Sequence, residues 1–214
     1  MIPLVHDFRD ETVLVFGGGS VGARKARRFA REARVLVVSP TFQGTQFGDA
    51  TLVRAAPDEA DVSDWLDRAS PALVVAATDD PDVNGAIEAA ARERGVLVNR
   101  ADESGTRDAG SVVVPATVRD GPVVVAVSTG GRSPALSRHL RERIEPAVES
   151  AGEMARLTAS VRETLQEQYA PDERRAAIRA VVRSDDVWKA LDTPSANARQ
   201  TASEVIADVT GETT

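Results

Sequence analysis

A glycine-rich segment near the N-terminus has the residue types and spacing of a phosphate-binding loop. Gly17, Gly19 and Gly22 fit the pattern G-x-G-x-x-G. In such a loop the first glycine allows a tight turn, the second lets the backbone approach a pyrophosphate, and the third allows close helix-to-strand packing. Because the segment follows a strand pattern and opens a helical one, free N–H groups and the helix dipole would face an anion. We therefore expect a bound dinucleotide; a glycine turn without a ligand is the alternative.

The end of the second expected strand lacks the acidic residue that commonly binds the adenine ribose of a dinucleotide. Ser39 occupies that position and is followed by Pro40 and Thr41. Arg24 or Arg34 could receive a 2′-phosphate, although a solvated surface arginine is the simpler interpretation of each. These residues alone leave the choice between NAD and NADP open.

Three aspartates and a threonine follow expected strands, at the sheet edge where open α/β sheets bind ligands. Asp102 comes just after the buried run 96–98. A carboxylate beside a nicotinamide can take a proton as a general base, but it can also simply cap a turn. Asp79 and Asp80 precede a helical pattern, which favours an N-cap for one of them. Thr78 ends a strand, and we expect its backbone to contact the cofactor.

A second glycine turn, Ser128-Thr-Gly-Gly-Arg-Ser-Pro134, leads into a helical pattern. A Gly-Gly turn at a helix N-terminus with an arginine beside it can bind an anion. Arg138 and Arg141 could add positive charge, and the alternative is a helix cap with solvated arginines. The residues expected to bind a negatively charged substrate are Ser128, Thr129, Gly130, Gly131, Arg132 and Ser133.

Composition excludes several other functions. The chain has no cysteine, which excludes thiolate zinc sites and a cysteine nucleophile. Its only histidines, His6 and His139, are far apart in sequence, so we expect no metal site, and His139 is expected to be a packing or surface residue. A formal net charge of −7 argues against nucleic-acid binding. Without a long apolar run or a signal peptide, we expect a cytoplasmic protein with no membrane partner.

The elements that must position these residues alternate between strand and helix. Expected strands lie at 12–16, 35–39, 51–54, 72–77 and 96–98, and expected helices at 23–32, 60–69 and 81–94. This alternation predicts the α/β class, with a Rossmann-type, doubly wound parallel sheet and right-handed crossovers.

The pattern changes after about residue 104. Two apolar runs, 111–114 and 122–127, flank a turn signal and predict an antiparallel hairpin. Ser133 and Pro134 then suit the N-cap and first position of a helix, and the remaining chain is helical and polar-rich, with Trp188 as a core candidate. We expect an NAD-binding Rossmann domain over 1–110, a small hairpin-and-helix region for dimerisation and substrate binding over 111–145, and a C-terminal helical region over 146–214.

Taken together, these motifs resemble the precorrin-2 dehydrogenase family, a module found alone or at the N-terminus of siroheme synthase. The matching segments are Ile2-Pro3-Leu4, 15–26, 76–80 with Asn84, 99–102 and 127–135. They cover about residues 1–150 well, and the C-terminal helices match only in general character. The chain departs from the family by extra residues within 103–110.

The resemblance implies an oxidoreductase that oxidises precorrin-2 to sirohydrochlorin with NAD, in siroheme and tetrapyrrole biosynthesis. It implies that Asp102 is the catalytic aspartate and that the protein is a homodimer. The residues expected to bind NAD are Gly17, Gly19, Ser20, Val21, Gly22, Pro40, Thr41 and Thr78.

Two alternatives remain at the level of the sequence. Some members of the family also insert Fe²⁺ into sirohydrochlorin, so this chain could be a bifunctional ferrochelatase. A non-catalytic NAD(H)-binding redox sensor is the other, although no basic recognition helix is present to read DNA.

Overall fold

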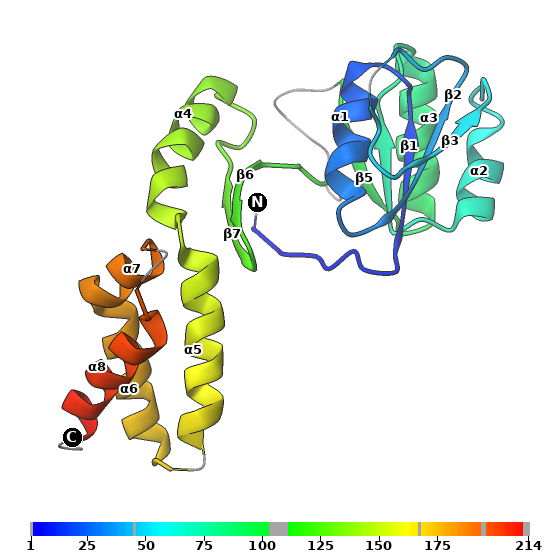
Figure 1. Cartoon of the computed structure of the whole chain (residues 1–214). Helices are drawn as coiled ribbons and strands as arrows, with labels where there is room; N and C mark the ends of the chain where they lie inside the picture. The colour runs from blue at the N-terminus through cyan, green and yellow to red at the C-terminus, as the bar shows by residue number, and fades with distance from the viewer. Residues whose placement is uncertain (1, 45, 103–110, 167, 194–195, 212–214) are drawn as a thin grey trace. The chain divides into compact units, whose positions relative to one another are not determined.

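The computed structural model describes residues 2–44, 46–102, 111–166, 168–193 and 196–211 of the chain. It divides into two compact units, one of Met1–Val114 with Gly130–Arg132 and the other of Pro115–Thr129 with Ser133–Thr214. Figure 1 labels most of the helices and strands of both units. Within the described residues, no helix is long and apolar enough to cross a membrane.

The first unit is a five-stranded parallel sheet in the order β3-β2-β1-β4-β5. Its strands are β1 (Thr12–Phe16), β2 (Arg34–Ser39), β3 (Thr51–Arg54), β4 (Leu73–Ala76) and β5 (Leu97–Arg100). Its helices are α1 (Ser20–Phe29), α2 (Val62–Ala69) and α3 (Pro81–Glu93). The predicted Rossmann-type parallel sheet is therefore confirmed.

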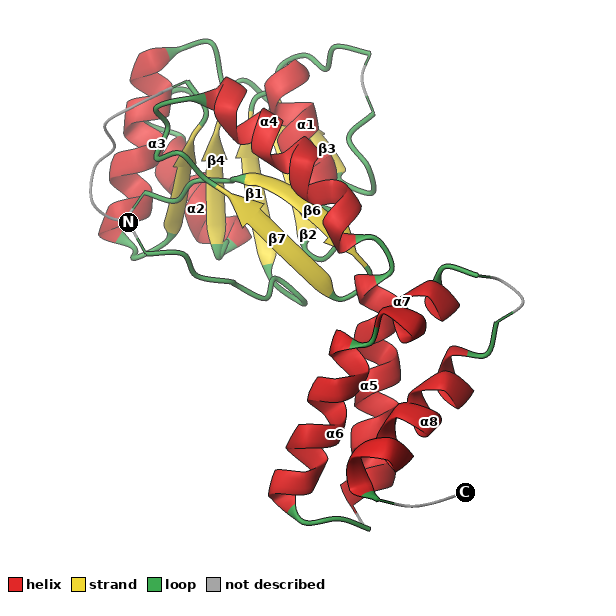
Figure 2. Cartoon of the chain, turned by 90° about the vertical axis from the view of Figure 1, so that its left-hand side faces the viewer, coloured by secondary structure: helices red, strands yellow, loops and turns green. Residues whose placement is uncertain are grey.

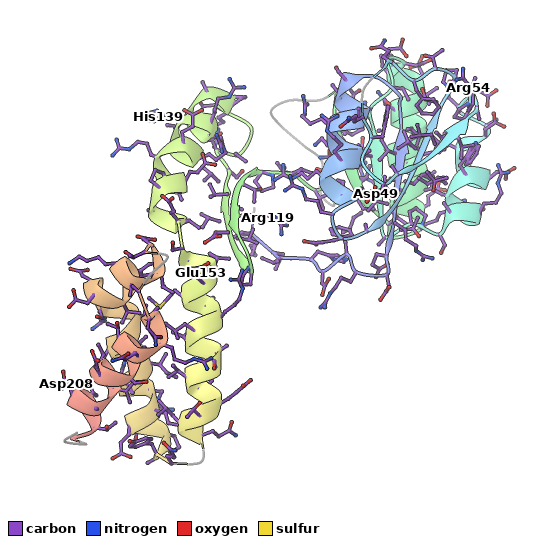
Figure 3. The ribbon with its side chains drawn as sticks, viewed as in Figure 1. Asp49, Arg54, Arg119, His139, Glu153 and Asp208 are labelled. Carbon is purple, nitrogen blue, oxygen red and sulfur yellow. The ribbon has the colours of Figure 1, made fainter. Side chains whose placement is uncertain are left out.

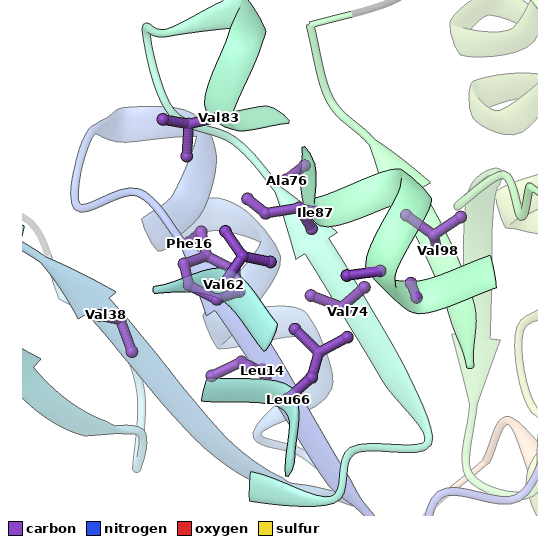
Figure 4. Packing of buried hydrophobic residues seen from close by; sticks show 12 residues of the cluster. Leu14, Phe16, Val38, Val62, Leu66, Val74, Ala76, Val83, Ile87 and Val98 are labelled. Carbon is purple, nitrogen blue, oxygen red and sulfur yellow. The ribbon is translucent and has the colours of Figure 1, made fainter. Parts of the chain in front are cut away.

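Helices cover both faces of this sheet because successive side chains of a strand point to opposite faces. Leu14 and Phe16 of β1 lie in a core cluster with residues of α2 and α3, as Figure 4 shows. Val13 and Val15 lie in a second cluster with residues of α1. All four side chains are fully buried, which explains why the strands are continuous apolar runs.

The strand order identifies the edge of the sheet at which a ligand is expected to bind. β1 pairs with β2 on one side and with β4 on the other, so the connections on its two sides run in opposite directions. In open α/β sheets, ligands bind outside the carboxyl ends of the strands at this switch point. The glycine loop after β1 and the loop after β4 both begin there.

The second unit contains a hairpin and a helical bundle with its own core. Its elements are β6 (Ala116–Asp120), β7 (Val123–Val127), α4 (Pro134–Ile144), the short 3₁₀ helix η1 (Glu145–Val148), α5 (Ala151–Gln166), α6 (Pro171–Arg183), α7 (Asp185–Leu191) and α8 (Ala198–Thr210). The coloured view in Figure 2 separates the hairpin strands from the helices that follow. The bundle buries Met154, Val161, Leu165, Ala177, Val181, Val187, Ala202 and Ile206, and Trp188 packs against this cluster as predicted.

The predicted first strand of the hairpin, 111–114, is wrong. Asp120 pairs with Val123 across a two-residue turn, so the register places the strand at 116–120. Turn length sets the register of a hairpin, and the polar residues of 116–120 carried no apolar signal. Residues 111 and 112 instead add to the parallel sheet, where the Val112 N–H donates to the Val98 carbonyl at 2.8 Å.

Gly85 in the middle of α3 gives a stability prediction. A Cβ atom added at Gly85 would meet no other atom within 4 Å. Glycine in a helix interior costs backbone entropy, so Gly85→Ala is expected to raise the free energy of unfolding by about 0.5–1 kcal/mol. Urea unfolding followed by circular dichroism measures the change, and a lower midpoint in the variant would contradict it.

Candidate functional site

A cavity of about 440 Å³ lies at the carboxyl ends of β1, β2 and β4. Its lining includes the glycine loop, the end of β2 and the loop after β4. Most of the residues predicted to bind NAD lie in it: Gly17, Gly19, Ser20, Val21, Pro40, Thr41 and Thr78. Seven further residues line the cavity without a role predicted from the sequence: Gly18, Val38, Gln43, Ala56, Pro57, Ala77 and Val83. Of these residues, only Gly18 could have been predicted from the sequence, because it belongs to the run of three glycines.

The glycine loop is built by close backbone approach. Gly17 has a φ of +118°, and a Cβ atom there would lie 2.2 Å from the Ala77 carbonyl oxygen. A Cβ atom on Gly18 would lie 2.1 Å from the Thr41 carbonyl oxygen. Only glycine fits at either position, so the loop holds the ends of β1, β2 and β4 together.

Helix α1 begins directly at this loop. It starts at Ser20, three residues before the predicted start at residue 23, and its N-cap Gly19 supplies no side-chain hydrogen bond. The first N–H groups of a helix need acceptors from outside the helix. Because side-chain capping is absent here, these groups can bind a phosphate, as the glycine pattern predicts.

The end of β2 differs from the expected site for a 2′-phosphate. Arg34 begins β2, so it lies at the opposite end of the strand from Ser39 and the cavity. Arg54, which Figure 3 labels, is instead paired in register with Ser39. Its Nη1 atom lies 3.5 Å from the Pro40 carbonyl oxygen. Only the parallel pairing of β2 with β3 brings this arginine to the cavity edge.

The loop after β4 is fixed by Asn84, a buried residue of α3. The Thr78 hydroxyl donates to Asn84 Oδ1 at 2.8 Å, and Asn84 Nδ2 donates to the Thr78 carbonyl at 3.1 Å. Asp80 accepts from the N–H groups of Asp82 and Val83, which confirms the N-cap predicted for one aspartate of this pair. Thr78 is thereby held at the cavity wall.

Asp102 follows β5 and is held by a two-pronged ion pair. Arg100 Nε donates to Oδ1 at 2.9 Å, and Arg100 Nη2 donates to Oδ2 at 2.7 Å. These hydrogen bonds lower the pKa of Asp102 below its ordinary value of 3.8, against the opposing effect of burial, and a hydrogen bond with Asn84 lowers it further. Asp102 is not among the described residues that line the cavity. Asn84 connects it to Thr78, which does line the cavity.

The end of β5 is fixed from its other face by Lys25. Lys25 Nζ donates to Asn99 Oδ1 at 2.7 Å, and Asn99 Nδ2 donates to the Val112 carbonyl at 2.7 Å. Asn99 is buried, so these bonds tie α1, β5 and the segment at 112 together. These hydrogen bonds therefore fix the end of strand β5, which Asp102 follows.

The second predicted site, 128–133, forms the loop between β7 and α4. Gly130 and Gly131 have φ angles of +63° and +79°, which favour glycine. The Ser133 side chain accepts from the Leu136 N–H at 3.3 Å, which confirms the predicted N-cap. Arg132 is exposed and forms no ion pair with a described residue. The predicted anion-binding role of this loop stays a prediction.

His139 is exposed on α4, as the side-chain view shows (Figure 3). Among the described residues, no group of three or more histidine or acidic side chains gathers in a way that could hold a metal ion. The extra residues at 103–110 lie outside the described residues.

Gly17→Ala tests whether the glycine loop is the nucleotide site. The new Cβ atom would collide with the Ala77 carbonyl, and the loop would have to move away from β4. We expect affinity for NAD⁺, measured by titration calorimetry, to fall by about tenfold or more, which corresponds to about 1.4 kcal/mol. Gly85→Ala, which meets no neighbouring atom, is the matched control and should bind as the wild type does. Unchanged affinity in Gly17→Ala would place the nucleotide elsewhere.

Comparisons with known proteins agree with this geometry. Residues 4–116 match a family described as putative NAD(P)-binding, and residues 120–146 match one described as sirohaem biosynthesis protein central. The precorrin-2 dehydrogenase of Methanosarcina barkeri is 35% identical over 214 residues, which cover 96% of this chain and 93% of the relative.

Longer relatives and a solved structure match as well. The siroheme synthase of Pseudomonas putida is 39% identical over 175 residues, which are 80% of this chain but 36% of that protein. The chain therefore spans about a third of that siroheme synthase. The solved structure of SirC, precorrin-2 dehydrogenase, has a TM-score of 0.67 and 20% identity, with 99% of this chain and 100% of that chain covered. This last likeness shows the fold.

Proposed function

The chain belongs to the precorrin-2 dehydrogenase family, and on that premise we propose that it oxidises precorrin-2 to sirohydrochlorin with NAD⁺ as the hydride acceptor. The observation that carries the proposal is the glycine-built cavity at the switch point of the sheet, with Asp102 joined to its wall through Asn84 and Thr78. The reaction removes one hydride and one proton from the tetrapyrrole. The protein must therefore bind the hydride acceptor and provide a proton acceptor.

The residues of the cavity fit NAD. The uncapped N–H groups at the start of α1 and the glycine backbone suit a pyrophosphate, and we assign this contact to Gly17, Gly19, Ser20 and Val21. Gly22 does not line the cavity and packs against the Gly17 carbonyl, where a Cβ atom would lie 2.0 Å from its oxygen. Pro40 and Thr41, at the end of β2, would lie beside the adenine ribose. Thr78 would lie beside the reacting ring. When bound, NAD⁺ supplies the chemistry of hydride acceptance.

Asp102 is the proposed general base. An aspartate with its ordinary pKa of 3.8 is already ionised at neutral pH, and hydrogen bonds from Arg100 lower the pKa of Asp102 further, so the carboxylate can accept the proton that the substrate loses. Its two oxygens are already oriented by Arg100, which reduces the reorganisation needed when the substrate binds. Asp102 thus takes a proton, while the cavity holds the hydride acceptor.

The substrate is a tetrapyrrole with several carboxylates, which an acidic protein must bind through local positive charge. We assign this role to the loop before α4, with its two glycines in the left-handed region and the exposed Arg132. Arg141 is already paired with Glu145 at 3.0 Å, so it offers less free charge than the exposed Arg138. The proposed substrate-binding residues are Ser128, Thr129, Gly130, Gly131, Arg132 and Ser133.

A homodimer is the proposed assembly. Helix α4 has no buried residue, and Leu136 and Leu140 on it are 47% and 37% exposed. A two-stranded hairpin is marginal by itself and needs a surface to pack on. A second copy of the chain that covers α4 and the hairpin would satisfy both requirements.

Asp102→Asn tests the catalytic assignment. The amide keeps the shape of the carboxylate but cannot accept the proton, so kcat should fall by about 10²- to 10⁴-fold. The measurement is NADH formation from precorrin-2 and NAD⁺ under anaerobic conditions, with NAD⁺ affinity expected to stay unchanged. Wild-type turnover by the variant would remove the base role from Asp102. Adding Fe²⁺ to the completed reaction tests the separate ferrochelatase hypothesis.

A double substitution in α4 tests the dimer. Leu136→Asp with Leu140→Asp would place two charges in the proposed interface, and we expect the dimer to dissociate to monomers in analytical ultracentrifugation. Val209→Asp is the matched control, because Val209 is 46% exposed on α8, outside the proposed interface. A dimer that survives the double substitution would require a different interface.

A further inference from the structure

Arg100 is the one charged side chain among the buried polar residues of the described chain, with 7% of its surface exposed. Burying a charge is costly unless an opposite charge and hydrogen bonds compensate it. Arg100 Nη1 donates to Glu88 Oε2 at 3.0 Å, and the Glu88 side chain is only 12% exposed. Arg92 Nη2 donates to the other Glu88 oxygen at 2.8 Å. Glu88 of helix α3 therefore fixes the Nη1 side of the Arg100 guanidinium.

The opposite edge of the Arg100 guanidinium faces Asp102. Nε and Nη2 each donate to a different oxygen of this carboxylate, which is the fork geometry that gives an arginine–carboxylate pair its orientation. A lysine could supply the charge but not the two parallel bonds. With Glu88 fixing one edge of the guanidinium and Asp102 bound at the other, the carboxylate has one favoured orientation.

We propose that Arg100 is a positioning residue for the reaction, which orients the Asp102 carboxylate, and that Glu88 holds Arg100 in place for this purpose. The inference rests on the proposed function, because it takes Asp102 as the general base. Arg100 itself touches neither the cofactor nor the substrate in this proposal. It acts through Asp102.

A compromise follows from this arrangement. Two hydrogen bonds from Arg100 make Asp102 a weaker base, which reduces the driving force for taking a proton. In return the carboxylate needs no reorientation when the substrate binds. Other charged groups lie on elements packed against β5 or directly follow such an element. Within the described chain these are Asp82, Glu88, Arg92 and Glu93 on α3, Arg24, Lys25, Arg27 and Arg28 on α1, and Asp79 and Asp80 after β4. Of these, Glu88 bonds Arg100, Arg92 bonds Glu88, and Lys25 bonds Asn99.

The experiment compares the pH dependence of kcat/KM in the full-length protein and in Arg100→Met. On the acidic side, activity is lost as Asp102 becomes protonated. Without Arg100 that protonation occurs at higher pH, so the acidic limb should move to higher pH. On the alkaline side, where Asp102 is ionised in both proteins, kcat should still fall by about tenfold or more because the orientation is lost. NAD⁺ affinity should not change.

Two further variants make the test specific. Arg100→Lys keeps the buried charge without the fork, so its acidic limb should stay close to that of the wild type while kcat falls. Arg94→Met is the matched control, because Arg94 also pairs through two nitrogens with an aspartate, Asp67, at 2.7 and 3.2 Å, but neither residue contacts Asp102. This control should keep the wild-type profile.

The outcomes separate this inference from the proposed function. If Asp102→Asn keeps wild-type turnover, the proposed function of Asp102 fails. If Asp102→Asn is inactive but folded Arg100→Met keeps the wild-type acidic limb and kcat, only the positioning role of Arg100 fails. Should Arg100→Met not fold, wild-type kcat in Arg100→Lys would overturn the proposal by itself.

Discussion

The close approach of three backbone segments at the carboxyl edge of the sheet is the constraint on which the site depends. Gly17 lies against the carbonyl of Ala77, and Gly18 lies against the carbonyl of Thr41. Side chains at these positions would separate the ends of β1, β2 and β4. Because the backbones meet, α1 begins at the cavity with its first N–H groups uncapped by side chains. The same contact forms both the walls of the cavity and the end at which we propose that an anion binds.

Buried polar side chains then fix what the backbone has brought together. Asn84 holds the loop after β4 through Thr78 and also bonds Asp102, so a single amide connects the cavity wall to the proposed base. Arg100 and Glu88 hold Asp102 from the other direction. Buried polar groups are tolerated only where they are satisfied, and here satisfying them also orients the proposed general base.

The two units differ in the kind of surface that they leave exposed. The first buries apolar residues on both faces of its sheet and leaves the carboxyl edge for NAD. In the second, the helical bundle has a core of its own, whereas α4 buries no residue and keeps leucines exposed. An exposed apolar helix beside a hairpin suits a surface that becomes covered in an assembly, which is the basis for the proposed dimer.

The sequence by itself determined the parallel sheet, the glycine loop and the helix caps at Asp80 and Ser133, because each depends on periodicity or on residues a few positions apart. The tertiary structure decided the hairpin register, in which a two-residue turn overrode the apolar signal of 111–114. It also decided that Arg54 rather than Arg34 lies beside the end of β2, and that Arg100 joins Glu88 to Asp102. The physical reason is the same in each case. Strand pairing and the partners of a buried charge are contacts between residues far apart in the sequence, so the local pattern of residues does not predict them.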